Sequence, residues 1–143
     1  MNDPTRLYEK SLRIVAADNL TKFDDCLNSG LVRLDEADYS DRTLLHWAAQ
    51  DEADDIAEKI ISIAPHLIDW EDEHGQTALR MASGEGHFIT AKVLLFYGAS
   101  IRCSCDSRDR TVLELAKRFG HEDVVLLLEI AEKNPLLLRR AKA

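Results

Sequence analysis

This 143-residue sequence lacks a membrane-spanning segment, a secretion signal and a disulfide pattern. It has no run of 18 apolar residues and no N-terminal basic segment followed by an apolar one, so we expect a soluble chain that is not secreted. Three cysteines without regular spacing argue against a disulfide framework and favour an intracellular compartment, cytoplasmic or nuclear. The length suits one domain, residues 1–143.

The motifs of common active sites are also missing. There is no H-E-x-x-H, no G-x-S-x-G and no Walker loop, and the five histidines fall in different parts of the chain. We interpret these histidines as turn braces and surface residues: His46, His66, His74, His87 and His121. The sequence therefore predicts no catalytic residue, cofactor or small-molecule substrate, with an intrinsic enzyme as the minor alternative.

Two clusters could suggest a metal site. Cys103 and Cys105 form a C-x-C, but two thiolates alone rarely hold zinc, and we favour an exposed loop over a soft-metal site. The acidic run from Asp51 to Asp55 lacks the spacing and the final Glu of a calcium loop. Acidic groups also favour the start of a helix, so we interpret the run as solvated and predict no metal. Gly84-Glu85-Gly86 is interpreted as a turn, not a phosphate loop.

Positive charge is scarce in the first half of the chain. Residues 1–75 hold 18 Asp or Glu against 7 Lys or Arg, net −11, whereas residues 76–143 hold 8 against 11, net +3, which agrees with the total of −8. An acidic surface repels nucleic acid and attracts basic partners. We expect neither nucleic-acid nor membrane binding; nucleic-acid binding by Arg139, Arg140 and Lys142 is a minor alternative.

The sequence does contain a period of 34 residues. The stretch Thr43-Leu-Leu-His-Trp-Ala-Ala49 returns in altered form from Thr77 to Ser83 and from Thr111 to Ala116. Leucine and alanine positions keep the same step: Leu45, Leu79 and Leu113, then Ala48, Ala82 and Ala116. Such a period marks stacked units that bury their apolar faces against their neighbours.

Each period predicts two short helices joined by a turn. We divide the chain into an atypical first unit at 5–37, units at 38–71, 72–105 and 106–131, and a cap or tail at 132–143. Asp3-Pro4 favours a helix start, and Pro65 ends the second helix of the second unit. Leu136-Leu137-Leu138 either cap the last unit or belong to a longer protein, and we favour capping.

These residues resemble an ankyrin repeat protein. Asp72-x-x-Gly75-x-Thr77-x-Leu79, then Gly86-His87, then Gly98-Ala99 follow the family pattern. The resemblance implies an all-α solenoid of helix-turn-helix units with short hairpin-like loops. It also implies that Thr and His brace the helix start, a pair that only Thr43 and His46 keep, because Arg80 and Glu114 replace the histidine. Glu52-Ala53 stand where the later units have Gly-His.

The resemblance further implies non-catalytic protein binding through a concave groove, lined by loop tips and by outward positions of the first helix of each unit. The expected contact residues are Tyr39, Ser40, Arg42, Gln50, Asp51, Glu73, His74, Gln76, Gly84, Glu85, Ser107, Arg108, Arg110, Arg118 and Phe119. Aromatic and Arg side chains dominate binding energy in interfaces, so we favour Tyr39, Arg42, Arg108, Arg110 and Phe119 as anchors.

The two tryptophans are interpreted separately. Trp47 lies where the family has an apolar seam residue, which favours the core. Trp70 lies near a loop tip between Asp69 and Glu71, where it is an equal candidate for a partner anchor. The function predicted is an adaptor or scaffold for a protein partner, and the uneven charge of the chain suggests a partner of bipolar charge. The alternatives are a regulatory subunit, assembly chaperone or inhibitor of a larger complex, or the ankyrin domain of a larger protein.

Overall fold

The computed structural model describes residues 4–102 and 111–134, with side chains from Lys10 onward. Within these ranges the chain forms eight α-helices, one short 3-10 turn and no strand. The helices are α1 (Pro4–Ala16), α2 (Leu20–Asn28), α3 (Leu44–Gln50), α4 (Asp54–Ile63), α5 (Ala78–Glu85), α6 (Phe88–Phe96), α7 (Val112–Arg118) and α8 (Glu122–Lys133), with the turn η1 (Pro65–Leu67) after α4. The all-α prediction is confirmed.

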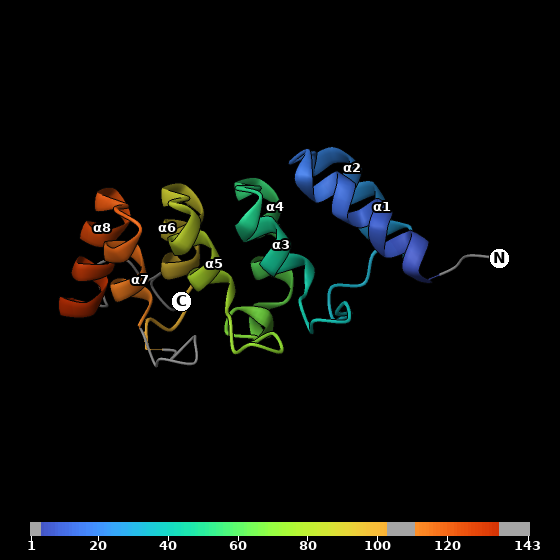
Figure 1. The fold of residues 1–143 in the computed structure, drawn as a ribbon. Helices are drawn as coiled ribbons and strands as arrows, with labels where there is room; N and C mark the ends of the chain where they lie inside the picture. The colour runs from blue at the N-terminus through green and yellow to red at the C-terminus, as the bar shows by residue number, and fades with distance from the viewer. Residues whose placement is uncertain (1–3, 103–110, 135–143) are drawn as a thin grey trace.

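The helices form two layers that run the length of the array (Figure 1). Helices α1, α3, α5 and α7 pack against one another in order, and α2, α4, α6 and α8 form the second layer. The loops that precede α3 and α5 lie on the side of the array opposite this second layer (Figure 1). Each helical pair therefore meets water on its outer edges and meets the neighbouring pairs on its broad faces.

The core follows the 34-residue period. Leu45 and Leu79 are both fully buried, and so are Ala48, Ala82 and Ala116. Small alanines at these positions let the first helices approach closely, while Ile56 and Ile60 of α4 fill the space between the layers. The periodic positions thus mark the core, as the sequence indicates, except that Leu113 in the fourth unit is half-buried against it.

The turns between paired helices use left-handed backbone. Gly86 and Gly120 have φ of +76° and +73°, and Glu52 occupies the matching position in the second unit with φ of +57°. The prediction for Gly84-Glu85-Gly86 needs a correction, because Gly84 and Glu85 belong to the last turn of α5 and only Gly86 forms its left-handed cap. A Cβ added at Gly84 would meet nothing within 4 Å, so packing does not require glycine at this helical position.

Pro65 ends α4 as predicted, since that helix stops at Ile63. The link that follows is compact: residues 65–67 form the 3-10 turn, and Leu67 is buried at 1% exposure. Several other predictions fall outside the described residues, namely those for Asp3, Cys103, Cys105, Ser107, Arg108, Arg110, Leu136–Leu138, Arg139, Arg140 and Lys142.

Candidate partner-binding surface

Two loop tips are built in the same way around an aspartate. The Asp38 Oδ1 accepts hydrogen bonds from the amides of Ser40 (2.9 Å) and Arg42 (3.1 Å). One period later, the Asp72 Oδ1 accepts hydrogen bonds from the amides of His74 (2.9 Å) and Gln76 (2.8 Å). An aspartate that caps its own turn in this manner fixes the loop without help from a partner.

The two tips are joined to each other. The Glu73 amide donates to the Ser40 carbonyl at 2.9 Å, and the Trp70 Nε1 donates to the Asp41 carbonyl at 3.1 Å. The Arg42 Nε lies 3.2 Å from the Asp72 Oδ2. Because these contacts cross from one unit to the next, the tips form one continuous edge.

Arg42 is held on two sides. Besides its ion pair with Asp72, its guanidinium lies 5.4 Å from the centre of the Trp47 ring, a cation–π distance. Trp47 is half-buried against the core, and its Nε1 donates to the Asp38 Oδ2 at 3.1 Å. The expectation of an apolar seam residue is therefore only partly met, because Trp47 has a polar role in the tip as well.

Thr43 and His46 form the predicted brace at the start of α3. The His46 Nδ1 lies 3.1 Å from the Thr43 amide and 3.0 Å from its hydroxyl. The other ring nitrogen, Nε2, lies 2.9 Å from the Gln76 carbonyl in the next unit. At the later starts, Thr77 and Thr111 still cap with the hydroxyl, which accepts from the amides of Arg80 and Glu114. At these two helix starts, Arg80 and Glu114 stand in place of the histidine whose ring contacts the tip of the next unit.

The ends of the first helices make a second row parallel to the tips. At 34-residue spacing this row contains Asp51, Glu85 and Phe119. Two histidines link it: the His87 Nε2 lies 2.9 Å from the Gln50 carbonyl, and the His121 Nε2 lies 2.9 Å from the Gly84 carbonyl. Each histidine thereby uses a free helix-end carbonyl of the preceding unit.

Exposure differs among the predicted contact residues. The most exposed aromatic residues on this surface are Tyr39 at 89%, Phe119 at 57% and Trp70 at 38%. Glu73, His74, Glu85 and Arg118 are exposed, Gln50 is half-buried, and Arg42 keeps 22% of its side chain exposed. Partial burial raises the pKa of Asp51 above its ordinary value, against the opposing effect of His87.

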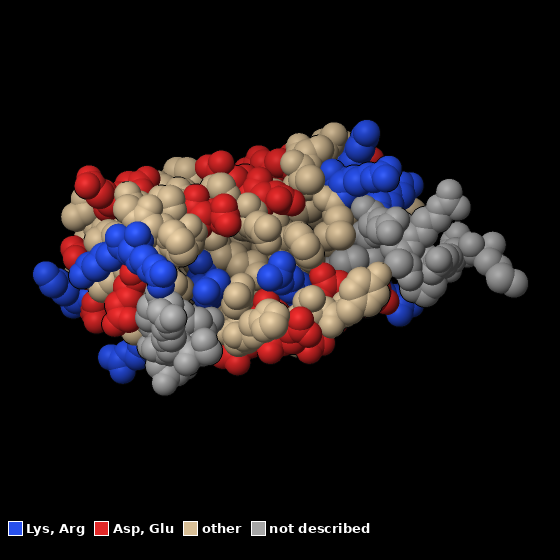
Figure 2. Space-filling model, in the orientation of Figure 1, with Lys and Arg blue, Asp and Glu red and all other residues tan. Residues whose placement is uncertain are grey.

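Charge along the row of helix ends changes sign. Asp51 and Glu85 are acidic, whereas Arg118 at the end of α7 is basic and lies beside Phe119. Figure 2 shows Asp and Glu gathered over the middle of the array, with Lys and Arg concentrated over α7 at one end and over α1 and α2 at the other. The N-terminal end is therefore less acidic on this face than the count for residues 1–75 indicates.

Three contributions to this surface were missed at the sequence level. Asp38 and Asp72 organise the tips, and their 34-residue spacing is the signal that could have shown it. The crossing of His46 to Gln76 and the sharing of Arg42 between Trp47 and Asp72 involve partners about one period apart or on another element, which pattern alone does not pair.

The comparisons with known proteins agree with this geometry. A family model described as "Ankyrin repeats (3 copies)" matches residues 45–135. The chain belongs to the ankyrin repeat family. It is 30% identical over 105 residues to protein glp-1 of Caenorhabditis elegans, which covers 73% of this chain and 8% of that protein. It is 35% identical over 95 residues to the 26S proteasome non-ATPase regulatory subunit 10 of Dictyostelium discoideum, covering 62% of this chain and 38% of that subunit.

This ankyrin chain thus spans well under two thirds of the length of these relatives. Members of the family are generally protein-interaction modules and typically non-catalytic. No described helix is long and apolar enough to cross a membrane. In residues 4–102 and 111–134, no three His, Cys, Asp or Glu side chains come together as a possible metal site.

Proposed function

We propose that this ankyrin array is an adaptor or scaffold that binds a protein partner between the loop tips and the ends of the first helices. The observation that supports it best is the pair of parallel, internally braced rows with exposed aromatic residues, Tyr39 on one row and Phe119 on the other. Rigid aromatic side chains on a preorganised surface bind with little loss of conformational entropy. No catalytic step is assigned to it.

The change of charge along the helix-end row supports a directional partner. A segment that is basic opposite Asp51 and Glu85 and acidic opposite Arg118 would dock in one orientation. Arg108 and Arg110, outside the described residues, would add to the basic end in this proposal. Binding should then weaken with salt and with charge reversal at these two arginines.

Affinity purification from the native cell tests the proposal. One bait carries Tyr39→Ala with Phe119→Ala, and its matched control carries Phe96→Ala with Leu126→Ala, which are 43% and 61% exposed on second-layer helices. We expect the first pair of changes to remove the partner and the control to retain it. Equal recovery by both baits would contradict binding at this surface, as would binding indifferent to both salt and the change of Arg108 and Arg110 to Glu.

A regulatory subunit or assembly chaperone of a larger complex is the second candidate. It is supported by the similarity to the 26S proteasome non-ATPase regulatory subunit 10 over 38% of that protein. The tagged chain should then co-migrate with 26S proteasome on native gels, and the Tyr39→Ala, Phe119→Ala bait should not. Migration of the wild-type chain apart from the proteasome would remove this candidate.

Two further proposals concern the size of the native protein and its location in the cell. The chain could serve as the ankyrin portion of a larger protein, which the 8% coverage of protein glp-1 supports. An intracellular, cytoplasmic or nuclear location is supported by the unevenly spaced cysteines. Immunoblotting of cell fractions with an antibody to this chain tests both, because it reports the size of the native protein and the compartment in which it is found.

A further inference from the structure

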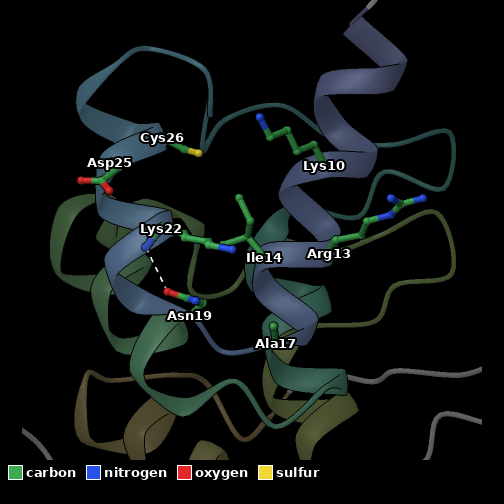
Figure 3. A pocket seen from close by; sticks show the side chains of 8 residues that line it. All are labelled: Lys10, Arg13, Ile14, Ala17, Asn19, Lys22, Asp25 and Cys26. Atoms are coloured by element: carbon green, nitrogen blue, oxygen red, sulfur yellow. Dashed lines mark hydrogen bonds between the residues drawn. The ribbon is translucent and has the colours of Figure 1, made fainter.

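A basic depression lies at the end of the stack formed by α1 and α2. Its volume is about 440 Å³, within the range of sites that hold a ligand or an inserted side chain. Figure 3 shows Lys10 and Arg13 extending from α1, and Lys22 and Cys26 on α2, around Ile14. Both helices therefore contribute to one concave face.

The repeat period indicates what this face corresponds to. Lys10, Lys22 and Cys26 stand 34 residues before Leu44, Ile56 and Ile60. Those three are buried at 1%, 0% and 0% exposure in the second unit, where α3 and α4 pack against the first. The depression is thus the counterpart of an apolar packing seam, with lysines at two of the three aliphatic positions and a cysteine at the third.

The charge of this face is opposite to that of the chain. Lys10, Arg13 and Lys22 are exposed, and only Asp25 contributes a carboxylate to the lining, so the face is net +2 on a chain of −8. In the part of the chain with described side chains, no ion pair involves any of the three cations. Cations on one face attract an anionic partner together, over a range of about 8–10 Å at physiological salt.

The centre of the face is apolar. Ile14 is 9% exposed at the base of the depression, Ala17 is exposed on its margin, and Cys26 is half-buried. An apolar base with a charged rim is the usual organisation of a protein-binding site, in which one side chain inserts and the rim selects by charge. A basic site with an apolar base therefore favours an anionic partner that also carries an apolar residue.

We propose that this end face is a second docking surface, which binds an acidic protein segment that inserts an apolar side chain over Ile14 and places carboxylates beside Lys10, Arg13 and Lys22. The surface adjoins the row of first-helix ends at Ala17, which stands 34 residues before Asp51, whereas its three cations lie outside the tips and helix ends of the proposed function. A repeat unit with an apolar face would fit this surface poorly, because stacking there would remove three charged side chains from water. An anionic membrane suits it poorly as well, because the rest of the chain is strongly acidic.

The test uses synthetic peptides and the full chain. The probe is a 15-residue peptide of Glu and Ala with one central Leu, compared with the same peptide carrying Ala at the centre and with one carrying Lys in place of Glu. Binding is followed through the NMR signals of the Ile14 and Ala17 methyl groups. We expect the Leu-containing acidic peptide to shift these signals, the Ala-centred peptide to bind several-fold more weakly, and the Lys peptide not to bind.

Matched variants locate the site. Changing Lys10, Arg13 and Lys22 to Glu should weaken binding by about tenfold or more, whereas changing the exposed Arg33, Lys92 and Lys133 to Glu alters net charge equally and should change it less than about twofold. If the first variant melts early, the Gln versions of its three changes provide the same comparison with a smaller loss. Three results overturn the proposal: no peptide binding up to about 1 mM, equal affinity for both variants, or binding of phosphatidylserine vesicles instead of the peptide.

Discussion

At the scale of single residues, His46 joins two neighbouring units through one buried ring. Its ring is 1% exposed, and its two nitrogens contact different segments: Nδ1 faces the Thr43 amide and Nε2 faces the Gln76 carbonyl. Nδ1 must accept from that amide, so the neutral ring carries its proton on Nε2 and donates to Gln76. A second proton on Nδ1 would remove the acceptor of the Thr43 amide at the start of α3.

This arrangement predicts a pH-dependent stability. Burial lowers the pKa of His46 below about 6.5, against opposing effects of the Gln76 carbonyl and Asp72, while Arg42 adds to the lowering. The unfolded chain then binds a proton more readily than the folded one. Stability is therefore fully present above about pH 6.5 and falls by up to about 1.4 kcal/mol per pH unit as pH drops from there towards the lower folded pKa.

Urea unfolding near pH 7.5 and near pH 5.5 measures it. A His46→Gln variant should be less stable near pH 7.5 by about 1–3 kcal/mol, because a glutamine amide cannot bridge the Thr43 amide and the Gln76 carbonyl as the rigid ring does. It should also lose less of its stability on acidification than the wild type does. The matched control is His74→Gln, whose side chain is 64% exposed and which should keep the wild-type pH dependence. Parallel pH profiles for His46→Gln and wild type would contradict the assignment.

Local chemistry at this scale was partly predictable from sequence. Thr43 and His46 lie three residues apart at a helix start, so their contact follows from spacing. Arg42 was predicted as a partner anchor from its residue type and place in the tip, but the Asp72 and Trp47 contacts that hold it depend on how two units meet. Its role towards a partner stays a prediction.

At the scale of elements, two turns between paired helices have the same backbone conformation but different packing around the glycine. Gly86 and Gly120 share a left-handed φ of +76° and +73°. A Cβ at Gly86 would lie 2.6 Å from the His121 Nδ1, whereas a Cβ at Gly120 would have nothing within 4 Å. The same substitution therefore tests strain alone at one turn and strain plus a steric clash at the other.

We expect Gly120→Ala to cost about 1 kcal/mol, the usual penalty for an alanine in left-handed backbone. Gly86→Ala should cost at least about 1 kcal/mol more, because the His121 ring must move off the Gly84 carbonyl that it contacts. Chemical denaturation of the two variants measures the difference. A Gly86→Ala, His121→Ala double variant should remove the extra cost, and equal losses for the two single variants would show that the ring does not matter.

The turn of the second unit offers the reverse change. Glu52 has φ of +57° where the later units have glycine, and its Oε2 is only loosely paired, 3.6 Å from the His87 Nδ1. Glu52→Gly should therefore stabilise the chain by about 0.5–1 kcal/mol. Glu58→Gly, in the interior of α4, should instead destabilise it by about 1 kcal/mol. A loss of stability in Glu52→Gly would mean that the pairing with His87 outweighs the backbone strain.

At the scale of the whole molecule, the period predicted a stack of two-helix units, and the resemblance to ankyrin repeats implied that they form an all-α solenoid. Leu45 and Leu79, or Ala48 and Ala116, each reach the core because the same helical pair is repeated and stacked. The shape of the binding surface was harder to predict from the sequence. Its continuity depends on contacts such as Glu73 to Ser40, and the basic end face depends on which side of α1 and α2 faces away from α3 and α4. Neither is a property of one unit.

Uneven burial along the array predicts that it does not unfold as one unit. Only Phe23 is buried in α2, whereas α4 buries Ile56, Ala57, Ile60 and Ile61. Because each pair is stabilised mainly by its neighbours, the pair α1 and α2 has one packed face and a polar outer face, while α3 to α6 have two packed faces. The first pair should open at a lower free energy than the middle of the stack.

Hydrogen exchange on the native chain measures this order. Amides of α1 and α2 should exchange faster than those of α3 to α6. Phe23→Ala should accelerate exchange in the first pair and leave α5 and α6 nearly unchanged. Leu79→Ala, which removes a fully buried side chain of α5, should lower the protection of the whole middle by about 2–5 kcal/mol. If Phe23→Ala instead lowered protection equally from α1 to α8, the stack would be cooperative throughout, and the outer pair would be as firmly held as the middle.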